Sequence, residues 1–531
     1  MKKILSAALL LASMSMNAQE TYTNAELATQ DLNGDARYVG MGGALNALGA
    51  NISAASDNPA AMGLFRSNSV SVSMGMTNHK NIGNADADSK SVVNFDQIGF
   101  VSHSRIGYNS HLNWGINYHK SANFNQILAA ASQGLEYGTI TNEDGSSYPV
   151  TGSQNGITFE KGNPRQDSHL TYTEVDELYQ GMFGIPTYRY LDVTFSSADN
   201  ILRRERKGYI GNFDFTISGN HQDRIYWGAG VTLSTVTYKN STNYQENMLD
   251  LGRPNGRITM EDYHEIEGSG VSMKAGVIFR PIEASPFRVG LSVETPTWYD
   301  LKSHSETYAE STIRIIEPDF ELHPTSGTTR CDYNFEVSTP WKFGLSAGTT
   351  FGKSVALGAS FDYADYSSMK SKIKDGGYYD WWYDTYYSTS HNDDVMNAHT
   401  SATLKGVSTL KLGAEFRIVP EVAFRLGYNY VAPMYKKDGV RNLFLESPGV
   451  DTATTTDYTN WDATSRFTCG IGFNIDNFFL DIAYQYNSTK GTYLPYQNCF
   501  DTELDSYVTP SMPVDLTSKR HQVLCTIGFK F

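Results

Sequence analysis

The stretch TLKLGAEFRIVPEVAFRLGYNY, residues 409–430, shows the pattern that decides the fold. Over residues 409–418, leucine, alanine, phenylalanine and isoleucine alternate with threonine, lysine, glycine, glutamate and arginine. Residues 419–420, Val-Pro, interrupt the alternation, which resumes over residues 421–430. A period of two places one set of side chains on each face of a β-strand. We therefore predict a hairpin with one apolar face and one face that carries full charges.

Segments with the same alternation fill most of the chain after residue 67. About fourteen of them can cross a bilayer at a tilt, and an even number suits an antiparallel barrel. A sandwich would also alternate, but its apolar face would need a second sheet to cover it. We therefore predict an all-β, transmembrane, antiparallel up-and-down barrel. The expected strands are 68–77, 92–103, 112–120, 207–218, 224–238, 262–280, 287–299, 331–351, 354–366, 404–418, 421–431, 465–474, 478–487 and 519–531.

Short and long connections alternate between these strands, as they do when one rim of a barrel faces the periplasm and the other faces outside. Tight turns rich in glycine, proline, asparagine and aspartate are expected at 220–223, 281–286, 352–353, 419–420 and 476–477. The long connections are 121–206, 239–261, 300–330, 367–403, 432–464 and 488–518.

The composition fits a membrane barrel and, taken alone, also a secreted soluble β-protein. Mean hydropathy is −0.39, yet aromatic residues reach 13%. Their placement favours the barrel, because aromatic belts mark the two membrane interfaces. We expect outward Tyr118, Tyr299, Tyr363, Tyr430 and Tyr486 near the long loops, and Phe279, Phe287, Phe416, Phe473 and Phe529 near the short turns.

The first residues predict export from the cytoplasm, and the net charge argues against nucleic acid as a partner. Met1–Ala18 joins two lysines, an apolar run and a final small residue, which is typical of a secretory signal peptide. The net charge of −15 disfavours nucleic acid as a partner. The four cysteines form no CxxC pair, and a disulfide between Cys331 and Cys499 is left open.

Before the first strand lies ARYVGMGGALNALGANISAASDNPAAMGLF, residues 36–65, which is almost free of charge. Side chains this small cannot form a core of their own, so the run packs inside a larger structure or serves as a flexible linker. Its GMGGA pattern at residues 40–44 and its Asn58-Pro59-Ala60 triplet resemble the N-terminal hatch of the FadL/TodX-type outer-membrane transporters.

The resemblance implies a barrel in the outer membrane of a Gram-negative bacterium, with an N-terminal hatch inside the lumen. That family carries long-chain fatty acids and other hydrophobic compounds, and hatch movement opens a path with lateral exit into the membrane. The implied division is a signal peptide at 1–18, a hatch at 19–67 and the barrel at 68–531. The hatch or gating residues would be Gly40, Gly42, Gly43, Asn58, Pro59 and Ala60.

The implied partners are a hydrophobic small-molecule ligand, outer-membrane lipid and lipopolysaccharide, and the barrel assembly machinery; a monomer is expected. The last strand, residues 519–531, ends in Phe531 with Val523, Ile527 and Phe529 on the same face. Such an end resembles the C-terminal signal that the assembly machinery reads.

Charges on the inward face are expected to pair or meet water. The sharper hypothesis is that basic groups meet a ligand carboxylate, with Lys411, Arg417 and Arg425 as candidates. The other inward charges are Asp214, Arg288, Glu294, Lys342, Asp362, Glu415 and Asp481.

No catalytic, metal or cofactor motif fits, and we expect no enzyme. Residues 31–35, DLNGD, begin like a calcium loop, but Ala36 and Gly42 stand where that loop needs glycine and glutamate. The GxSxG match at residues 344–348 lies within an expected strand, whereas a nucleophile elbow joins a strand to a helix.

Two outer connections have alternative interpretations. Residues 170–190 form either a short amphipathic helix over the mouth or an ordinary surface loop. The aromatic run at 378–383, YYDWWY, either binds an apolar ligand or sugar or packs against its neighbours.

Two functions follow from the sequence. One is a channel for passive uptake of hydrophobic or amphipathic small molecules, such as long-chain fatty acids. The other is a barrel that docks secreted or surface proteins, or receives a haem-like ligand. A continuous apolar route through the lumen favours uptake, whereas a lumen of paired charges inside a closed wall favours docking.

Overall fold

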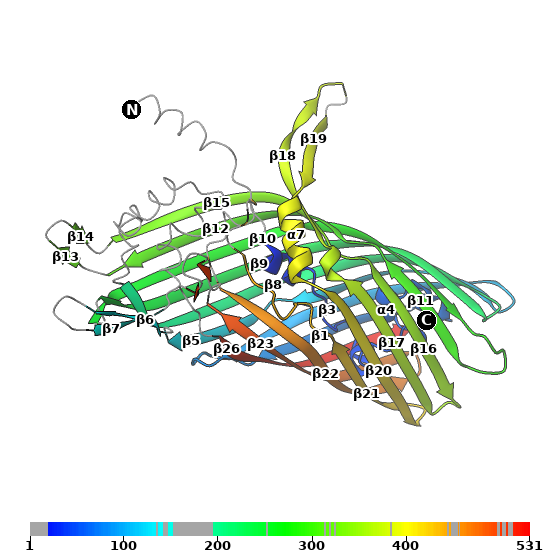
Figure 1. The fold of residues 1–531 in the computed structure, drawn as a ribbon. Coiled ribbons are helices and arrows are strands. Elements are labelled where there is room, and N and C mark those ends of the chain that lie inside the picture. The colour runs from blue at the N-terminus through cyan, green and yellow to red at the C-terminus, as the bar shows by residue number, and fades with distance from the viewer. Residues whose placement is uncertain are drawn as a thin grey trace.

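The alternating segments fold into one closed barrel of 14 antiparallel strands in the computed structural model (Figure 1). The structure describes residues 20–133, 136–141, 147–151, 195–250, 253–312, 315–317, 320–322, 325–382, 385–442, 445, 447, 455, 457–495, 500–501, 506–507 and 513–531. The first strand pairs with the last over its full length, from Ser69 opposite Lys530 to His79 opposite Arg520. This pairing closes the wall.

The wall runs in chain order, and twelve of its strands are continuous. They are β1 (Ser69–His79), β3 (Lys90–Gly107), β4 (Ser110–Asn123), β8 (Phe195–His221), β9 (Ile225–Asp250), β10 (Arg253–Phe279), β17 (Val355–Asp365), β20 (Gly406–Val419), β21 (Val422–Val431), β22 (Tyr458–Ile475), β23 (Phe478–Leu494) and β26 (Val514–Lys530). The remaining two positions are each split, into β11 (Arg288–Glu294) with β12 (Trp298–Ser311), and β15 (Thr325–Ser338) with β16 (Lys342–Phe351).

The two splits lie side by side and share a cause. Each contains a proline, Pro296 or Pro340, which cannot donate to a strand ladder. Thr297 and Thr339 bridge the gap, since the amide of Thr297 donates to the Thr339 hydroxyl at 2.8 Å. The alternation of inward and outward side chains shifts by one residue across each split. Odd-numbered Leu291 faces outward before the first split, whereas even-numbered Trp298 faces outward after it.

The outward face is a belt of exposed large apolar residues, as expected of a transmembrane barrel. On β9 this belt ends near Leu233, after which Thr235, Thr237 and Lys239 occupy the outward positions. The strand nevertheless continues to Asp250, which at about 3.3 Å a residue is roughly 50 Å further. Strands β8, β9, β10, β12 and β15 thus form a curved wall that extends beyond the belt (Figure 1).

Smaller elements lie within the long connections. They are β5 (Gln126–Gln133), which pairs with β8 and with β2 (Ile82–Gly83), the hairpins β6 (Glu136–Thr141)–β7 (Ser147–Thr151), β13 (Ile315–Glu317)–β14 (Phe320–Leu322), β18 (Lys370–Asp380)–β19 (Thr385–Asn392) and β24 (Phe500–Asp501)–β25 (Ser506–Tyr507), and the helices η4 (Tyr366–Ser368) and α7 (Asp394–Thr403). None of the helices in the described ranges is long and apolar enough to span a membrane.

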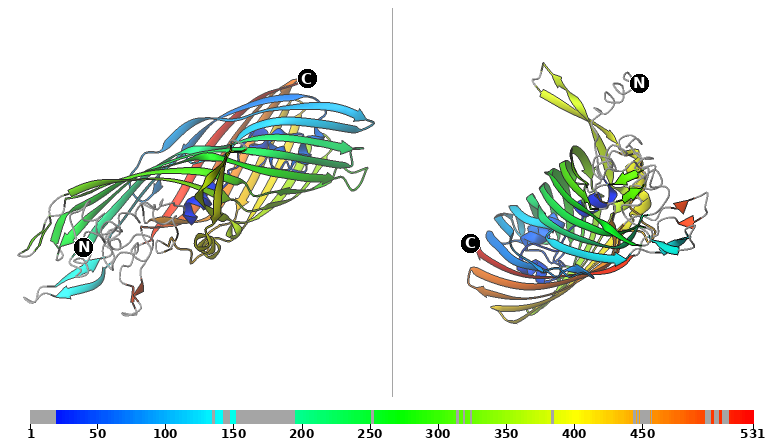
Figure 2. Two further views of the ribbon diagram at one scale, coloured as in Figure 1. Left: turned by 90° about the horizontal axis from the view of Figure 1, so that it is seen from above. Right: turned by 90° about the vertical axis from the view of Figure 1, so that its left-hand side faces the viewer.

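Residues 20–65 lie inside the ring of strands, as the right-hand view of Figure 2 shows in blue. Their elements are α2 (Thr21–Leu27), α3 (Ala36–Gly40), α4 (Ile52–Asp57) and η1 (Pro59–Leu64). Inward glycines of the wall let this backbone approach closely. A Cβ added to Gly358 of β17 would lie 1.9 Å from the carbonyl oxygen of Ala44, and one added to Gly413 of β20 would lie 2.3 Å from that of Met41.

The barrel class, the strand number and all five tight turns agree with the sequence prediction. The connections expected at 239–261 and 300–330 are wrong, because most of these residues continue strands. Both faces of those strand extensions are mostly polar, with Tyr244 and Leu301 among the few buried apolar side chains, so the alternation is weak. The prediction that Tyr299 faces outward is also wrong. Its side chain is buried, because the alternation shifts by one residue at the first split and turns Tyr299 inward.

We predict that Gly358→Ala loosens residues 41–48. The added methyl group meets a backbone oxygen that has no room to retreat, and overpacking of this kind costs about 1–3 kcal/mol. Backbone hydrogen exchange over these residues should accelerate about tenfold or more. The control is Ala359→Val, which enlarges the neighbouring outward position. Equal exchange in the two variants would contradict this account of the glycines.

Candidate functional site

The residues that the sequence assigned to the hatch lie against the wall. Gly42 and Gly43 adopt φ angles of 62° and 81°, a region that favours glycine. Asn58 caps η1, since its Oδ1 accepts from the amide of Ala60 at 3.1 Å. A Cβ on Gly228 of β9 would lie 2.4 Å from the carbonyl carbon of Pro59. These contacts fix the position of the segment, and a gating role for its residues stays a prediction.

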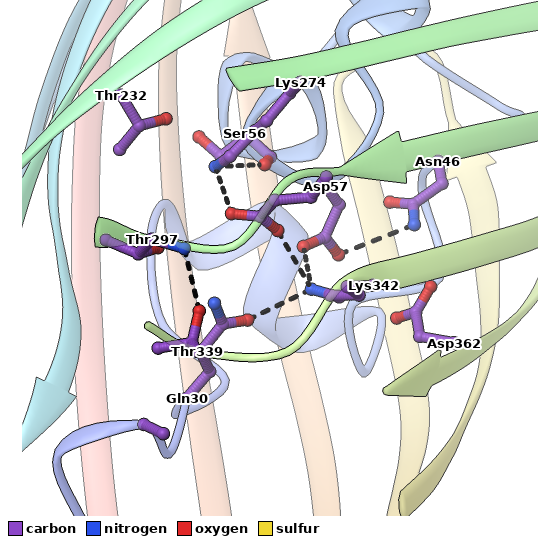
Figure 3. A network of polar contacts seen from close by, with 12 residues as sticks. Gln30, Asn46, Ser56, Asp57, Thr232, Lys274, Thr297, Thr339, Lys342 and Asp362 are labelled. Carbon is purple, nitrogen blue, oxygen red and sulfur yellow. Dashed lines mark hydrogen bonds and ion pairs between the residues drawn. The ribbon is translucent and has the colours of Figure 1, made fainter. Parts of the chain in front are cut away.

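Asp57, at the end of α4, joins the N-terminal segment to two strands by charge. Figure 3 shows its pair with Lys342 and its hydrogen bond from Asn46. Its carboxylate pairs with Lys342 of β16 at 3.4 Å and with Lys411 of β20. It also accepts from the hydroxyl of Tyr38 at 2.5 Å and from the amide of Asn46 at 3.5 Å. Removal of one partner from such a buried cluster leaves an uncompensated charge, so these pairs resist separation of α4 from β16 and β20. We call the contacts of Asp57 with Lys342 and Lys411 the latch.

Neighbouring charges extend this network around the wall. Lys411 also pairs with Asp362 at 2.9 Å. Lys274 of β10 donates to the carbonyl oxygen of Ser56 at 2.8 Å and lies 3.5 Å from Glu294. These inward charges therefore pair as the sequence predicted, whereas Arg288 donates to the carbonyl oxygen of Leu48 at 3.3 Å. We name this network of Asp57, Lys274, Glu294, Lys342, Asp362 and Lys411 the lysine cluster.

A second ionic cluster lies nearer the short turns. Glu415 pairs with Arg37 of α3 at 2.9 Å and with Arg425 at 2.8 Å, and Arg425 reaches Asp481 at 2.6 Å. Arg425 is buried, whereas the side chain of Arg417 is 47% exposed and lies 3.6 Å from Glu415. Of the three proposed ligand residues, only Lys411 borders the cavity described next.

A cavity of about 420 Å³ lies within the barrel, between α2 and the lysine cluster. At the α2 side its lining combines aromatic rings with ion pairs: Tyr22 stacks on Tyr435 with ring centroids 5.0 Å apart and lies 5.3 Å from Tyr458, while Glu20 and Glu26 pair with arginines that border the same side. Phe124 and Tyr238 meet edge to face at 5.2 Å. At the opposite side the lining consists of ion-paired and hydrogen-bonded groups. We call this cavity the chamber.

Two arginine side chains and one aspartate lie together in the chamber lining, so positive charge exceeds negative charge within this group. Asp31 makes two hydrogen bonds to Arg520, at 2.7 and 2.8 Å, and lies 3.8 Å from Arg466. Arg466 also donates to Asn429 at 2.9 Å, while its Nε has no hydrogen-bond partner in the structure. Two guanidinium groups thus share one close carboxylate.

Helix α2 separates the chamber from the outer mouth. Glu26 pairs with Arg206 at 2.8 Å and Glu20 with Arg441 at 3.5 Å. Thr21 hydrogen-bonds to Nδ1 of His399 on α7 at 2.8 Å. Burial lowers the pKa of His399, so this histidine is neutral at pH 7.

The connection before β22 is held beside α2 by a bidentate pair. Both oxygens of Asp457 accept from Arg204 at 2.7 Å. Burial alone would raise the pKa of Asp457, but the guanidinium group outweighs it and holds the pKa of that carboxyl below its usual range.

The sequence analysis missed Asp57, Asp31 and Arg466. Asp57 carried a usable signal, since it and Arg37 are the charged residues of the small-residue run, and a lone charge that packs inside a protein needs a partner. Asp31 was weighed only as a calcium ligand. Arg466 resembles any other inward charge in a strand.

Some predictions fall wholly or partly outside the described residues: the signal peptide at 1–18, the outer segment at 170–190 and Cys499. The pairing of Cys331 with Cys499 therefore stays open. Of the aromatic run at 378–383, the structure describes the side chains of Trp381 and Trp382.

No family model matches the sequence, and no curated protein matches it significantly. Among solved structures, a Pseudomonas aeruginosa FadL homologue aligns with 95% of this chain and 100% of its own, with a TM-score of 0.51 and 12% identity. This chain has the fold of a FadL-type barrel. At such low identity the likeness shows the fold alone. Toluene transporters also align, TodX of Pseudomonas putida with 11% identity and a TM-score of 0.48, and TbuX of Ralstonia pickettii with 14% and 0.44; each comparison covers 94% of this chain and 99% of the other.

We predict that Asp57→Asn releases the N-terminal segment from β16 and β20. The substitution leaves Lys342 and Lys411 buried without this carboxylate, and breaking a buried pair costs about 3–5 kcal/mol. Hydrogen exchange over α3 and α4 should rise. The control is Asp223→Asn, which breaks a pair with Arg66 whose side chains are 31% and 37% exposed, a surface interaction worth about 1 kcal/mol or less. Unchanged protection in Asp57→Asn would show that the lysines do not hold the segment.

Proposed function

We propose that this protein is an outer-membrane channel for passive uptake of amphipathic small molecules that carry an anionic group, such as long-chain fatty acids. The observation that carries the proposal is the chamber, which lies inside the barrel between α2 and the lysine cluster. A concave site that combines aromatic surface with convergent polar groups is a usual form of a small-molecule site, and the chamber combines both. The barrel fold and its apolar belt support an outer-membrane location.

The two sides of the chamber suit the two parts of an amphiphile. The rings of Tyr22, Tyr435 and Tyr458 offer apolar surface on the side of the outer mouth. Arg466 and Arg520 offer the local excess of positive charge, because they share Asp31. A ligand carboxylate beside Arg466 would make charge-assisted hydrogen bonds, and guanidinium groups favour this planar geometry.

Onward movement requires displacement of the N-terminal segment, because it fills the lumen beyond the chamber. We propose that Gly40, Gly42, Gly43 and the Asn58-Pro59-Ala60 turn serve as its hatch, and that Lys411 contributes to the latch through Asp57.

Docking of a secreted or surface protein is the second candidate. It is supported by the ion-paired lumen and by the wall of β8–β10, which continues far beyond the apolar belt. A passive channel does not require such a wall.

Binding of a fluorescent long-chain fatty acid to the detergent-solubilised protein tests the uptake proposal. We predict saturable binding that weakens about tenfold or more in Arg466→Gln, since a hydrogen bond to a charged group contributes about 1.5–3 kcal/mol. The matched control is Arg417→Gln, which removes a guanidinium group outside the chamber.

Loss of binding in Arg417→Gln instead would favour the ligand site expected from the sequence. Absence of saturable binding, both for the fatty acid and for an uncharged aromatic probe, would overturn the uptake proposal in favour of docking.

A further inference from the structure

The β18–β19 hairpin leaves the barrel at the outer edge of the apolar belt. Its root is fixed by pairing with β15, where Lys370 lies opposite Ser338 and Ile373 opposite Phe335. Ser338 in turn lies opposite Trp298, whose outward side chain is 45% exposed. Trp341 and Tyr363, also outward and exposed, lie close to the same root along the chain. Aromatic side chains in this setting mark the membrane interface.

From this root the hairpin projects sideways from the barrel (Figure 1 and the right-hand view of Figure 2). Among the described residues it pairs with the wall only from Lys370 to Ile373, and from Lys374 onward its ladder is internal. At about 3.3 Å a residue, residues 374–380 of β18 can reach roughly 23 Å from the wall. A strand of this direction and height extends over the lipid that surrounds the barrel.

The tip carries Trp381 and Trp382, whose side chains are 86% and 94% exposed. Five tyrosines flank them in sequence, at positions 378, 379, 383, 386 and 387. Tryptophan and tyrosine favour the headgroup level of a bilayer, because one part of each ring system is apolar and another part forms hydrogen bonds. Asp380 and Asp384 enclose the tip in sequence, and their charges oppose deeper entry into hydrocarbon.

The root carries three lysines. Lys372 pairs with Glu336 at 3.7 Å and Lys374 with Asp300 at 2.6 Å, whereas Lys370 is exposed. Amines at headgroup level suit the anionic groups of outer-leaflet lipid. The hairpin therefore combines an exposed lysine at its root with an aromatic tip, beside the aromatic edge of the belt.

We propose that the β18–β19 hairpin is a lateral membrane arm whose tryptophan tip rests in the headgroup region of the outer leaflet. The arm fixes the height and orientation of the rim from which α7 continues to the outer mouth. This role is independent of the ligand that the chamber takes.

Fluorescence quenching in liposomes tests the arm. The full-length protein is reconstituted into phosphatidylcholine and phosphatidylglycerol vesicles whose lipids are brominated either near the carbonyl end or near the methyl end of the acyl chain. The difference between wild type and the double variant Trp381→Phe/Trp382→Phe isolates the emission of the tip. Both changes lie on the exposed end of the hairpin, so folding of the barrel is unaffected.

We expect lipid brominated near the carbonyl end to quench the tip emission at least twofold more strongly than lipid brominated near the methyl end. Trp114, 48% exposed on the belt, and Trp461, which lines the chamber, provide the positive and negative references when each is replaced by phenylalanine in turn. Tip emission that is as poorly quenched as that of Trp461 would overturn the proposal and leave the hairpin in water, accessible to a soluble partner. Stronger quenching near the methyl end would overturn the interfacial depth.

Discussion

Paired charges hold the N-terminal segment against the inner wall of the barrel. A barrel of this size would enclose a water-filled lumen if nothing occupied it. Here Asp57 meets two strand lysines, and Arg37 meets a strand glutamate, so that each end of the small-residue run is held by an ion pair. Because these groups are shielded from water, neither partner can be lost cheaply.

The inner face of the wall fits the backbone of this segment closely. Inward glycines at 228, 358 and 413 sit where the backbone of the segment comes closest, and larger residues there would clash with it. The segment itself is rich in alanine and glycine, whose small side chains also allow its backbone to lie close to the wall. Ion pairs and close backbone approach are complementary: the charges fix the position of the segment, and the glycines make that position possible. The chamber is the space that remains between this packed layer and α2.

The sequence predicted most of the fold, because a period of two is set by strand geometry and reads directly from residues such as 409–430. It did not predict the strand extensions at 239–250 or 301–311, where both faces are polar, nor the inward position of Tyr299, which depends on the local phase change beside Pro296. The candidate site was harder still. Inward charges were recognised on single strands, but the partners of Lys411 and Arg466 include Asp57 and Asp31, which lie hundreds of residues earlier in the chain. Arg417, Arg425 and Arg466 cannot be told apart before the segment is in place.

The most direct test of the account is single-channel conductance in planar lipid bilayers, with the full-length protein compared with a form that lacks residues 36–65. The deleted form should first show the heat-modifiable migration of a folded barrel. We predict that the full-length protein is closed to small ions or opens only briefly, and that the deletion gives a stable, open pore. A full-length protein that conducts as well as the deleted form would contradict the claim that the ion-paired segment closes the lumen.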